Sequence, residues 1–135
     1  TIQHAKSWVK RSITAALHEN KTEANFAIDI NGEVMGGIGL TNIASAKAEI
    51  GYWLAKEQWG KGVMTAAVEK IMQFGFNKVG LDRIYGLVMY KNKASIRVLE
   101  KTGFTFEKRM KKYFTEGKYV DVVQYVKTRE QWKKT

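Results

Sequence analysis

Cysteine and proline are absent from the sequence, and so are long apolar runs. Without cysteine, the chain has no disulfide, thiolate metal site or cysteine nucleophile. Without proline, its turns must be marked by Gly, Asn and Asp. No stretch approaches the roughly 20 apolar residues that cross a bilayer, and no signal segment is recognised near the start. His4 and His18 form no pattern with carboxylates. We therefore expect a cytoplasmic protein without metal or membrane contact.

Positive charge exceeds negative charge, with a formal net charge of +10 over 135 residues. Residues 101–135 hold ten Lys and Arg but only four Asp and Glu. Such an excess favours a polyanionic partner, such as nucleic acid, the ribosome, an acidic protein or a phosphate-bearing cofactor. A solubilising surface explains the same charge, so both interpretations stay open.

The order of hydrophobic patterns predicts a single α/β domain over residues 1–135. Helices are expected at 3–18, 62–77 and 92–102, and strands at 25–30, 33–43, 49–55, 83–90, 104–111 and 119–127. Asn31-Gly32 separates the first two strands, and an Asn-Gly pair predicts a hairpin because both turn residues tolerate positive φ. Strands followed by alternating helices and strands predict a mixed sheet covered by helices, with a βαβ-like unit in the middle.

A glycine-containing loop, Trp59-Gly60-Lys61-Gly62-Val63-Met64-Thr65, joins the strand at 49–55 to the helix at 62–77. Its glycines let the backbone come close to a ligand, and the helix N-terminus offers free N–H groups and a partial positive charge. Lys61 adds a cation, so pyrophosphate is the natural guest. A plain tight turn explains the glycines equally well, and the spacing is not that of a Walker loop.

The segment from Asn92 to Phe104 predicts a short helix with a defined start and end. Asn92 is placed to cap its N-terminus, and Gly103 to end it. Ser95 shares one helical face with Val98, Leu99 and Thr102. Its hydroxyl therefore points to the apolar side, where it needs a hydrogen-bond partner.

Alternation along the strand at 49–55 places Glu49, Gly51 and Trp53 on one face and Ile50, Tyr52 and Leu54 on the other. A carboxylate in a strand that leads to an anion-binding loop is a candidate general base. An exposed Glu at a strand start is the simpler interpretation of Glu49.

Together these motifs resemble the GNAT superfamily of acetyl-CoA-dependent N-acetyltransferases, and more narrowly its RimJ/RimL-type branch of ribosomal-protein N-acetyltransferases. The resemblance rests on Ala-Glu-Ile-Gly-Tyr-Trp-Leu-Ala at 48–55, Gly60-Lys61-Gly62, and Asn92-x-x-Ser95 ending at Gly103-Phe104, in the family's order over about residues 24–127. It implies a GNAT-like, central twisted sheet with helices on both faces, and acetyl-CoA held where the central parallel strands part.

The resemblance also implies roles for single residues. The backbone of Leu54 and Ala55 would bond the pantetheine, Asn92 would bind the same arm, and Ser95 would lie near the thioester sulfur. The pyrophosphate would be held by amides of the loop, namely those of Trp59, Gly60, Lys61, Gly62, Val63, Met64 and Thr65. Glu49 matches a catalytic glutamate of some members, and the amine would attack the thioester directly, without an acyl-enzyme.

The chain departs from the family's pattern at three positions. The phosphate loop usually starts with Gln or Arg, where this chain has Trp59. Met64 stands where Gly or Ala is usual, so its side chain must turn away from the phosphates. Leu99 stands where many members have a Tyr general acid. The acid role is therefore left open among Ser95, Tyr90, Tyr85 and water.

The family's first strand and helix would lie before Thr1, so we expect natural sequence to precede it. The strand at 25–30 would then be an unprotected edge, which invites pairing with another chain. A longer native protein or a homodimer would cover it.

The preferred function is acetylation of a protein N-terminus, of the ribosomal-protein type. The alternative within enzymes is a small-molecule N-acetyltransferase acting on a polyamine, an aminoglycoside or an amino acid. A third interpretation is a non-catalytic module that binds CoA or RNA, since aromatic residues alternate with charges in the last third of the chain. Aromatics in closing strands are also typical of a core.

Overall fold

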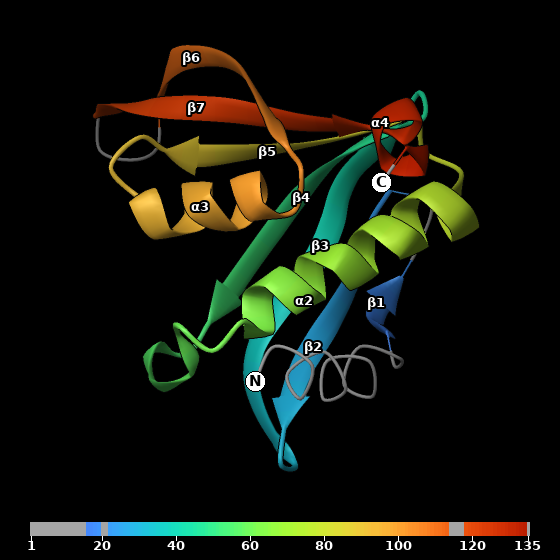
Figure 1. The fold of residues 1–135 in the computed structure, drawn as a ribbon, viewed down its shortest axis with the longest axis vertical. Coiled ribbons are helices and arrows are strands. Elements are labelled where there is room, and N and C mark those ends of the chain that lie inside the picture. Colours follow the sequence, from blue (N-terminus) through green and yellow to red (C-terminus); the bar gives the residue numbers. More distant parts are fainter. Residues whose placement is uncertain (1–15, 20–21, 114–117, 135) are drawn as a thin grey trace.

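The computed structural model describes residues 16–19, 22–113 and 118–134, which form one seven-stranded sheet with helices packed on it (Figure 1). The strands are β1 (Ala16–Glu19), β2 (Ala24–Ile30), β3 (Glu33–Ala44), β4 (Lys47–Leu54), β5 (Arg83–Met89), β6 (Thr105–Tyr113) and β7 (Tyr119–Thr128). The helical elements are η1 (Lys56–Gln58), α2 (Val63–Gln73), the π-helical η2 (Phe74–Val79), α3 (Lys93–Lys101) and α4 (Arg129–Lys133). The strand order is β1-β2-β3-β4-β5-β7-β6.

The sheet is mixed because β4 and β5 are parallel while the other neighbouring strands are antiparallel. The helix α2 connects β4 to β5, and this crossover is the predicted βαβ unit. The hairpin between β2 and β3 turns at Asn31 and Gly32, whose φ angles are 56° and 82°. Both the mixed α/β class and the hairpin predicted from the sequence are confirmed.

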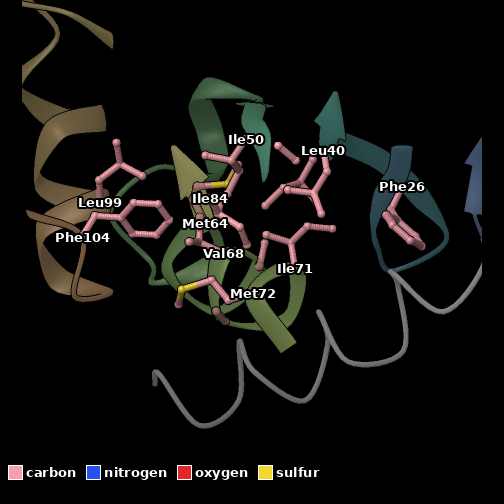
Figure 2. Close-up of a cluster of buried hydrophobic side chains, with 14 of the residues drawn as sticks. Phe26, Leu40, Ile50, Met64, Val68, Ile71, Met72, Ile84, Leu99 and Phe104 are labelled. Atoms are coloured by element: carbon pink, nitrogen blue, oxygen red, sulfur yellow. The ribbon is translucent and has the colours of Figure 1, made fainter. Parts of the chain in front are cut away.

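The core lies between the sheet and the helices α2 and α3, which cover the same face (Figure 2). From the strands come Phe26, Leu40, Ile50 and Ile84, from α2 come Met64, Val68, Ile71 and Met72, and Leu99 and Phe104 follow from α3 and the turn after it. Helices were expected on both faces, and the described helices that carry this core lie on one. The predicted helix at 3–18 lies mostly outside the described residues.

The short strand β1 corrects the prediction for the N-terminal region. Residues 16–18 were expected to end a helix, and the strand at 25–30 was expected to be a bare edge. Instead β1 pairs antiparallel with the start of β2, from Ala16 opposite Phe26 to Glu19 opposite Ala24. Backbone pairing with an open strand therefore outweighs the helical spacing of a few apolar residues.

The helix α4 was not predicted, although the sequence contains a signal for it. The side chain of Thr128 accepts a hydrogen bond from the backbone N–H of Gln131, and the side chain of Gln131 accepts one from the N–H of Thr128. This reciprocal capping box follows the Thr-x-x-Gln pattern. Trp132 of α4 stacks on Phe76 with ring centroids 5.3 Å apart. Within the described residues, no helix is long and apolar enough to cross a membrane.

Two glycines that face each other across β3 and β4 provide a matched test of this packing. A Cβ on Gly39 would lie 2.7 Å from the carbonyl oxygen of Ala24 and close to the side chain of Asn25, whereas a Cβ on Gly51 would meet nothing within 4 Å. Because backbone cannot easily yield, we expect Gly39→Ala to lower the free energy of unfolding by about 1–3 kcal/mol.

Gly51→Ala should change the same free energy by less than about 0.5 kcal/mol. Urea unfolding of both variants checks the prediction. Equal losses in the two variants would contradict the register and the crowding around Gly39.

Candidate functional site

The central feature of the site is the gap that opens between β4 and β5. The two strands pair from Lys47 opposite Arg83 to Glu49 opposite Tyr85, and there the ladder ends. β4 continues to Leu54 and β5 continues to Met89, and the two strands diverge toward the end of the sheet where α3 and the start of α2 lie (Figure 1). The strands therefore leave backbone groups unpaired along the gap.

The hydrogen bonding of β3 fixes which groups of β4 face the gap. The N–H of Ala55 donates to the carbonyl oxygen of Met35, with N and O 2.7 Å apart, so this residue directs its backbone toward β3. Because backbone groups alternate in direction along a strand, Leu54 and Tyr52 direct theirs toward β5. Of the two predicted pantetheine contacts, Leu54 faces the gap and the N–H of Ala55 is already used.

The side chain of Trp59 reaches back to the gap. Its indole N–H donates to the carbonyl oxygen of Leu54 over 2.8 Å, although the side chain is largely exposed. This bond ties the start of the glycine loop to the edge of β4. The sequence interpretation gave the side chain of Trp59 no role, so this is a correction. The family's usual Gln or Arg at this position also carries N–H donors.

The loop ends at the N-terminus of α2 and has the features of an anion site. Gly60 and Gly62 have φ angles of 76° and 78°, in the left-handed region that side chains disfavour. Gly62 is the N-cap of α2, no side chain caps this end, and the first turn holds no acidic residue. Lys61 is exposed beside it. Free N–H groups and a partial positive charge therefore face outward together.

The remaining loop residues differ in burial. Val63 and Met64 are buried in the core, so the side chain of Met64 turns away from the loop as the sequence required. Thr65 is half-buried. Among the described residues, no group of three or more His, Asp or Glu is placed to hold a metal ion.

The hydroxyl of Ser95 was expected to need a hydrogen-bond partner, and that partner is Tyr52. The Ser95 hydroxyl donates to Tyr52 Oη over 2.9 Å, and Tyr52 Oη donates to the Ser95 carbonyl oxygen over 3.2 Å. Burial raises the pKa of Tyr52, and the bond from Ser95 lowers it by less, so Tyr52 is protonated at neutral pH. Asn92 accepts a hydrogen bond from the Ser95 N–H over 3.1 Å, which confirms it as the N-cap of α3. Sequence reasoning placed Tyr52 on the right face but did not connect it with Ser95.

Glu49 lies on the opposite face of β4 from Ser95 and Tyr52, as the alternation predicted. Its Oε1 accepts a hydrogen bond from Asn42 Nδ2 over 3.2 Å. Glu49 stands beside Tyr85 at the closed end of the gap, where burial first and the negative charge of Glu49 second raise the pKa of Tyr85. The two predicted catalytic residues are therefore on opposite sides of the sheet, with the gap between them.

Two other positions bear on the choice of a general acid. Leu99, at the position where many family members have a Tyr acid, is fully buried and packs directly over Gly86 of β5. The ring of Tyr90 contacts two cations, with its centroid 3.6 Å from Lys93 Nζ and 4.1 Å from Arg109 Cζ. Tyr52 and Ser95 are thus the hydroxyl pair on the helix side of β4.

Comparison with known proteins agrees with this geometry. Residues 1–105 match the family described as acetyltransferase (GNAT) domain. The chain belongs to this GNAT acetyltransferase family.

Three relatives show the range of the family around this chain. The chain is 35% identical over 116 residues to the Bacillus subtilis protein named "Putative ribosomal N-acetyltransferase YdaF", a match that spans 84% of this chain and 62% of that protein. It is 29% identical to the spermidine N(1)-acetyltransferase of Escherichia coli K12, across 78% of this chain and 58% of the relative. The crystal structure of a ribosomal-protein-S5-alanine acetyltransferase from Vibrio fischeri superposes with a TM-score of 0.76 at 27% identity, covering 82% of this chain and 64% of that one.

The bond from Trp59 to Leu54 leads to a prediction for cofactor binding. Trp59→Phe keeps an aromatic ring but removes the indole N–H, so the loop loses its tie to β4. A net hydrogen bond contributes about 0.5–1.5 kcal/mol, and we expect acetyl-CoA to bind about threefold to tenfold more weakly. Titration calorimetry measures the dissociation constant.

The matched control is Trp53→Phe, which changes a second exposed indole on the same stretch and leaves the Leu54 carbonyl bond intact. If Trp59→Phe bound acetyl-CoA as tightly as the control, the indole bond would have no part in holding the loop.

Proposed function

We propose that the protein is an acetyl-CoA-dependent N-acetyltransferase that moves an acetyl group onto a primary amine by direct attack in a ternary complex. The observation that carries the proposal is the gap between β4 and β5. It has a helix N-terminus without a side-chain cap at its open end, a hydroxyl pair on one side and a carboxylate on the other. The acetyl group and the amine can meet there from opposite faces of the sheet.

The residues around the gap fit an extended thioester cofactor with a pyrophosphate. The loop amides from Trp59 to Thr65 would hold the pyrophosphate, supported by Lys61, and the N–H of Leu54 would bond the pantetheine. The carbonyl oxygen of Leu54 has two lone pairs, so it can accept from Trp59 and from the cofactor. Asn92 and Ser95 would border the same arm at the start of α3. When bound, acetyl-CoA supplies the activated acetyl group.

The chemistry requires a neutral amine and a protonated leaving sulfur. The amine nitrogen attacks the thioester carbonyl carbon, the carbon–sulfur bond breaks, and the amine loses a proton as the thiolate gains one. Glu49, directly or through water, would accept the amine proton. Ser95, whose hydroxyl donates to the protonated Tyr52 in this structure, would turn its hydroxyl to supply a proton to sulfur. Positioning the reactants in the gap would contribute much of the rate.

The acceptor we favour is the α-amino group of a protein N-terminus, of the ribosomal-protein type. With a pKa near 7.8, about a tenth of such amines is neutral at pH 7, against roughly 0.04% of lysine side chains, so one modest base suffices. The names of the relatives include a putative ribosomal N-acetyltransferase and spermidine N-acetyltransferases. A protein with a net charge of +10 repels polycations, which disfavours a polyamine as the acceptor. Binding to a ribosome, assembly as a homodimer and a cytoplasmic location stay predictions.

Glu49→Gln tests the proposed base. Removing a general base typically costs about 10²–10⁴-fold in rate, and the lower end is expected because α-amines are partly neutral already. We expect kcat to fall about 100-fold at pH 7 while the dissociation constant of acetyl-CoA is unchanged. Rates from pH 6 to 9 are followed by release of the CoA thiol, with Glu33→Gln at the exposed β2–β3 turn as control. A turnover equal to wild type across this range would remove Glu49 from the mechanism.

Gly62→Val tests the phosphate site. Valine at a φ of 78° is strained, and its side chain would disturb the loop, so acetyl-CoA should bind at least tenfold more weakly. Gly32→Val is a matched control, since Gly32 has a φ of 82° and open space around it, in a hairpin turn at residues 31–32. Calorimetric titration measures the dissociation constant of acetyl-CoA for both variants. If the control binds saturably and 1:1, and Gly62→Val binds with the same dissociation constant, the assignment is contradicted.

A further inference from the structure

The sheet face that lies away from α2 and α3 carries two diverging rows of side chains along the gap. Alternate residues of a strand share a face, and the core residues of β4 and β5 lie on the helix side. The row from β4 consists of Glu49, Gly51 and Trp53. The row from β5 consists of Tyr85, Leu87 and Met89. Apart from Glu49 and the hydroxyl of Tyr85, these rows are apolar.

Trp53 lies with the nitrogen edge of its indole over Gly37 of β3 and remains exposed. A Cβ built on Gly37 of β3 would be 2.6 Å from the Nε1 atom of Trp53, so the indole lies against the bare backbone of its neighbouring strand. Yet 59% of Trp53 is exposed. A large aromatic surface held in place and left open to solvent is typical of a binding surface.

The space next to Trp53 is open above Gly51. A Cβ on Gly51 would meet no atom within 4 Å, in contrast to the crowded Gly39 opposite. Glu49 and Trp53 are four residues apart in the strand, which places them about 13 Å apart with Gly51 midway. This length accommodates an amine at Glu49 and the side chain of the same acceptor residue over Gly51, with its end on the indole.

The charges on this face favour an acceptor with one positive group. Glu49 is the carboxylate at the closed end of the gap. On the strands next to the gap, Glu33 stands at the exposed start of β3, and Asp121 of β7 already pairs with Arg109 and Lys111. One strand farther out lie Asp29 on β2 and Glu107 on β6, which binds Arg83 and Gln124. A polyamine would leave its remaining cations against apolar surface, where a charge without a partner is costly.

We infer that Gly51 and Trp53 form the acceptor subsite, and that it takes an α-amine borne by a residue with an apolar or aromatic side chain. The amine stands at Glu49, the side chain lies over Gly51, and its end contacts the indole of Trp53. This assignment rests on the proposed acetyl transfer and names its substrate class.

Three small amines test the inference with the protein as it is: phenylalaninamide, glycinamide and spermidine. Kinetics by thiol release should give phenylalaninamide a kcat/KM about 10-fold or more above glycinamide, since burial of a side chain in an apolar site discriminates by about 10–200-fold. Spermidine should be the poorest acceptor. In Trp53→Ala the advantage of phenylalaninamide over glycinamide should disappear, while acetyl-CoA binding stays at the wild-type value.

Further variants separate the subsite from general damage. Trp53→Phe should retain most of the preference, and Gly51→Val should abolish it by filling the open space. Val34→Ala, which trims another apolar side chain with 57% exposure, should change nothing. A preference for spermidine, or a phenylalaninamide advantage that survives both Trp53→Ala and Gly51→Val, would overturn the inference. A wild-type protein that binds acetyl-CoA but acetylates none of the three amines would overturn the proposed transfer as well.

Discussion

Beyond Glu49 and Tyr85, the backbones of β4 and β5 stop pairing, and the groups that would have bonded each other face a shared gap. The helix α3 packs against both strands where the gap begins. A Cβ on Gly86 of β5 would contact both Ile50 of β4 and Leu99 of α3 at 3.2 Å, so α3 rests on the two strands just where they part. Tyr52 then reaches Ser95 across the opening. Each part of the site is therefore positioned by one interruption in the sheet.

The sequence predicted those elements whose signals are local. The Asn31-Gly32 hairpin depends on two adjacent residues with positive φ, and the start of α3 depends on a cap that joins Asn92 to Ser95, three positions later. The glycine loop was found because two glycines directly before a helix let the backbone approach a ligand, and the structure gives both positive φ angles. The face of Ser95 followed from helical periodicity.

Interactions between distant segments could not be predicted in this way. The bond between Tyr52 and Ser95 joins residues 43 apart in the sequence, and periodicity gives a face but no partner. The hydrogen bond of Trp59 depends on how η1 turns the chain back toward Leu54. The strand β1 forms because β2 offers it a free edge, which overrides its local pattern. The helix α4 is different, because its capping box at Thr128 and Gln131 was readable and was missed.

The arrangement of the strands also has a mechanical consequence. Four strands, β1 to β4, and three strands, β5 to β7, are joined within the sheet by a parallel seam of only three residue pairs. The two parts of the sheet thus share few backbone hydrogen bonds with each other. A ligand that bonds to β4 and to the start of α3 would link them beyond this seam. Its binding free energy would add to the stability of the folded chain.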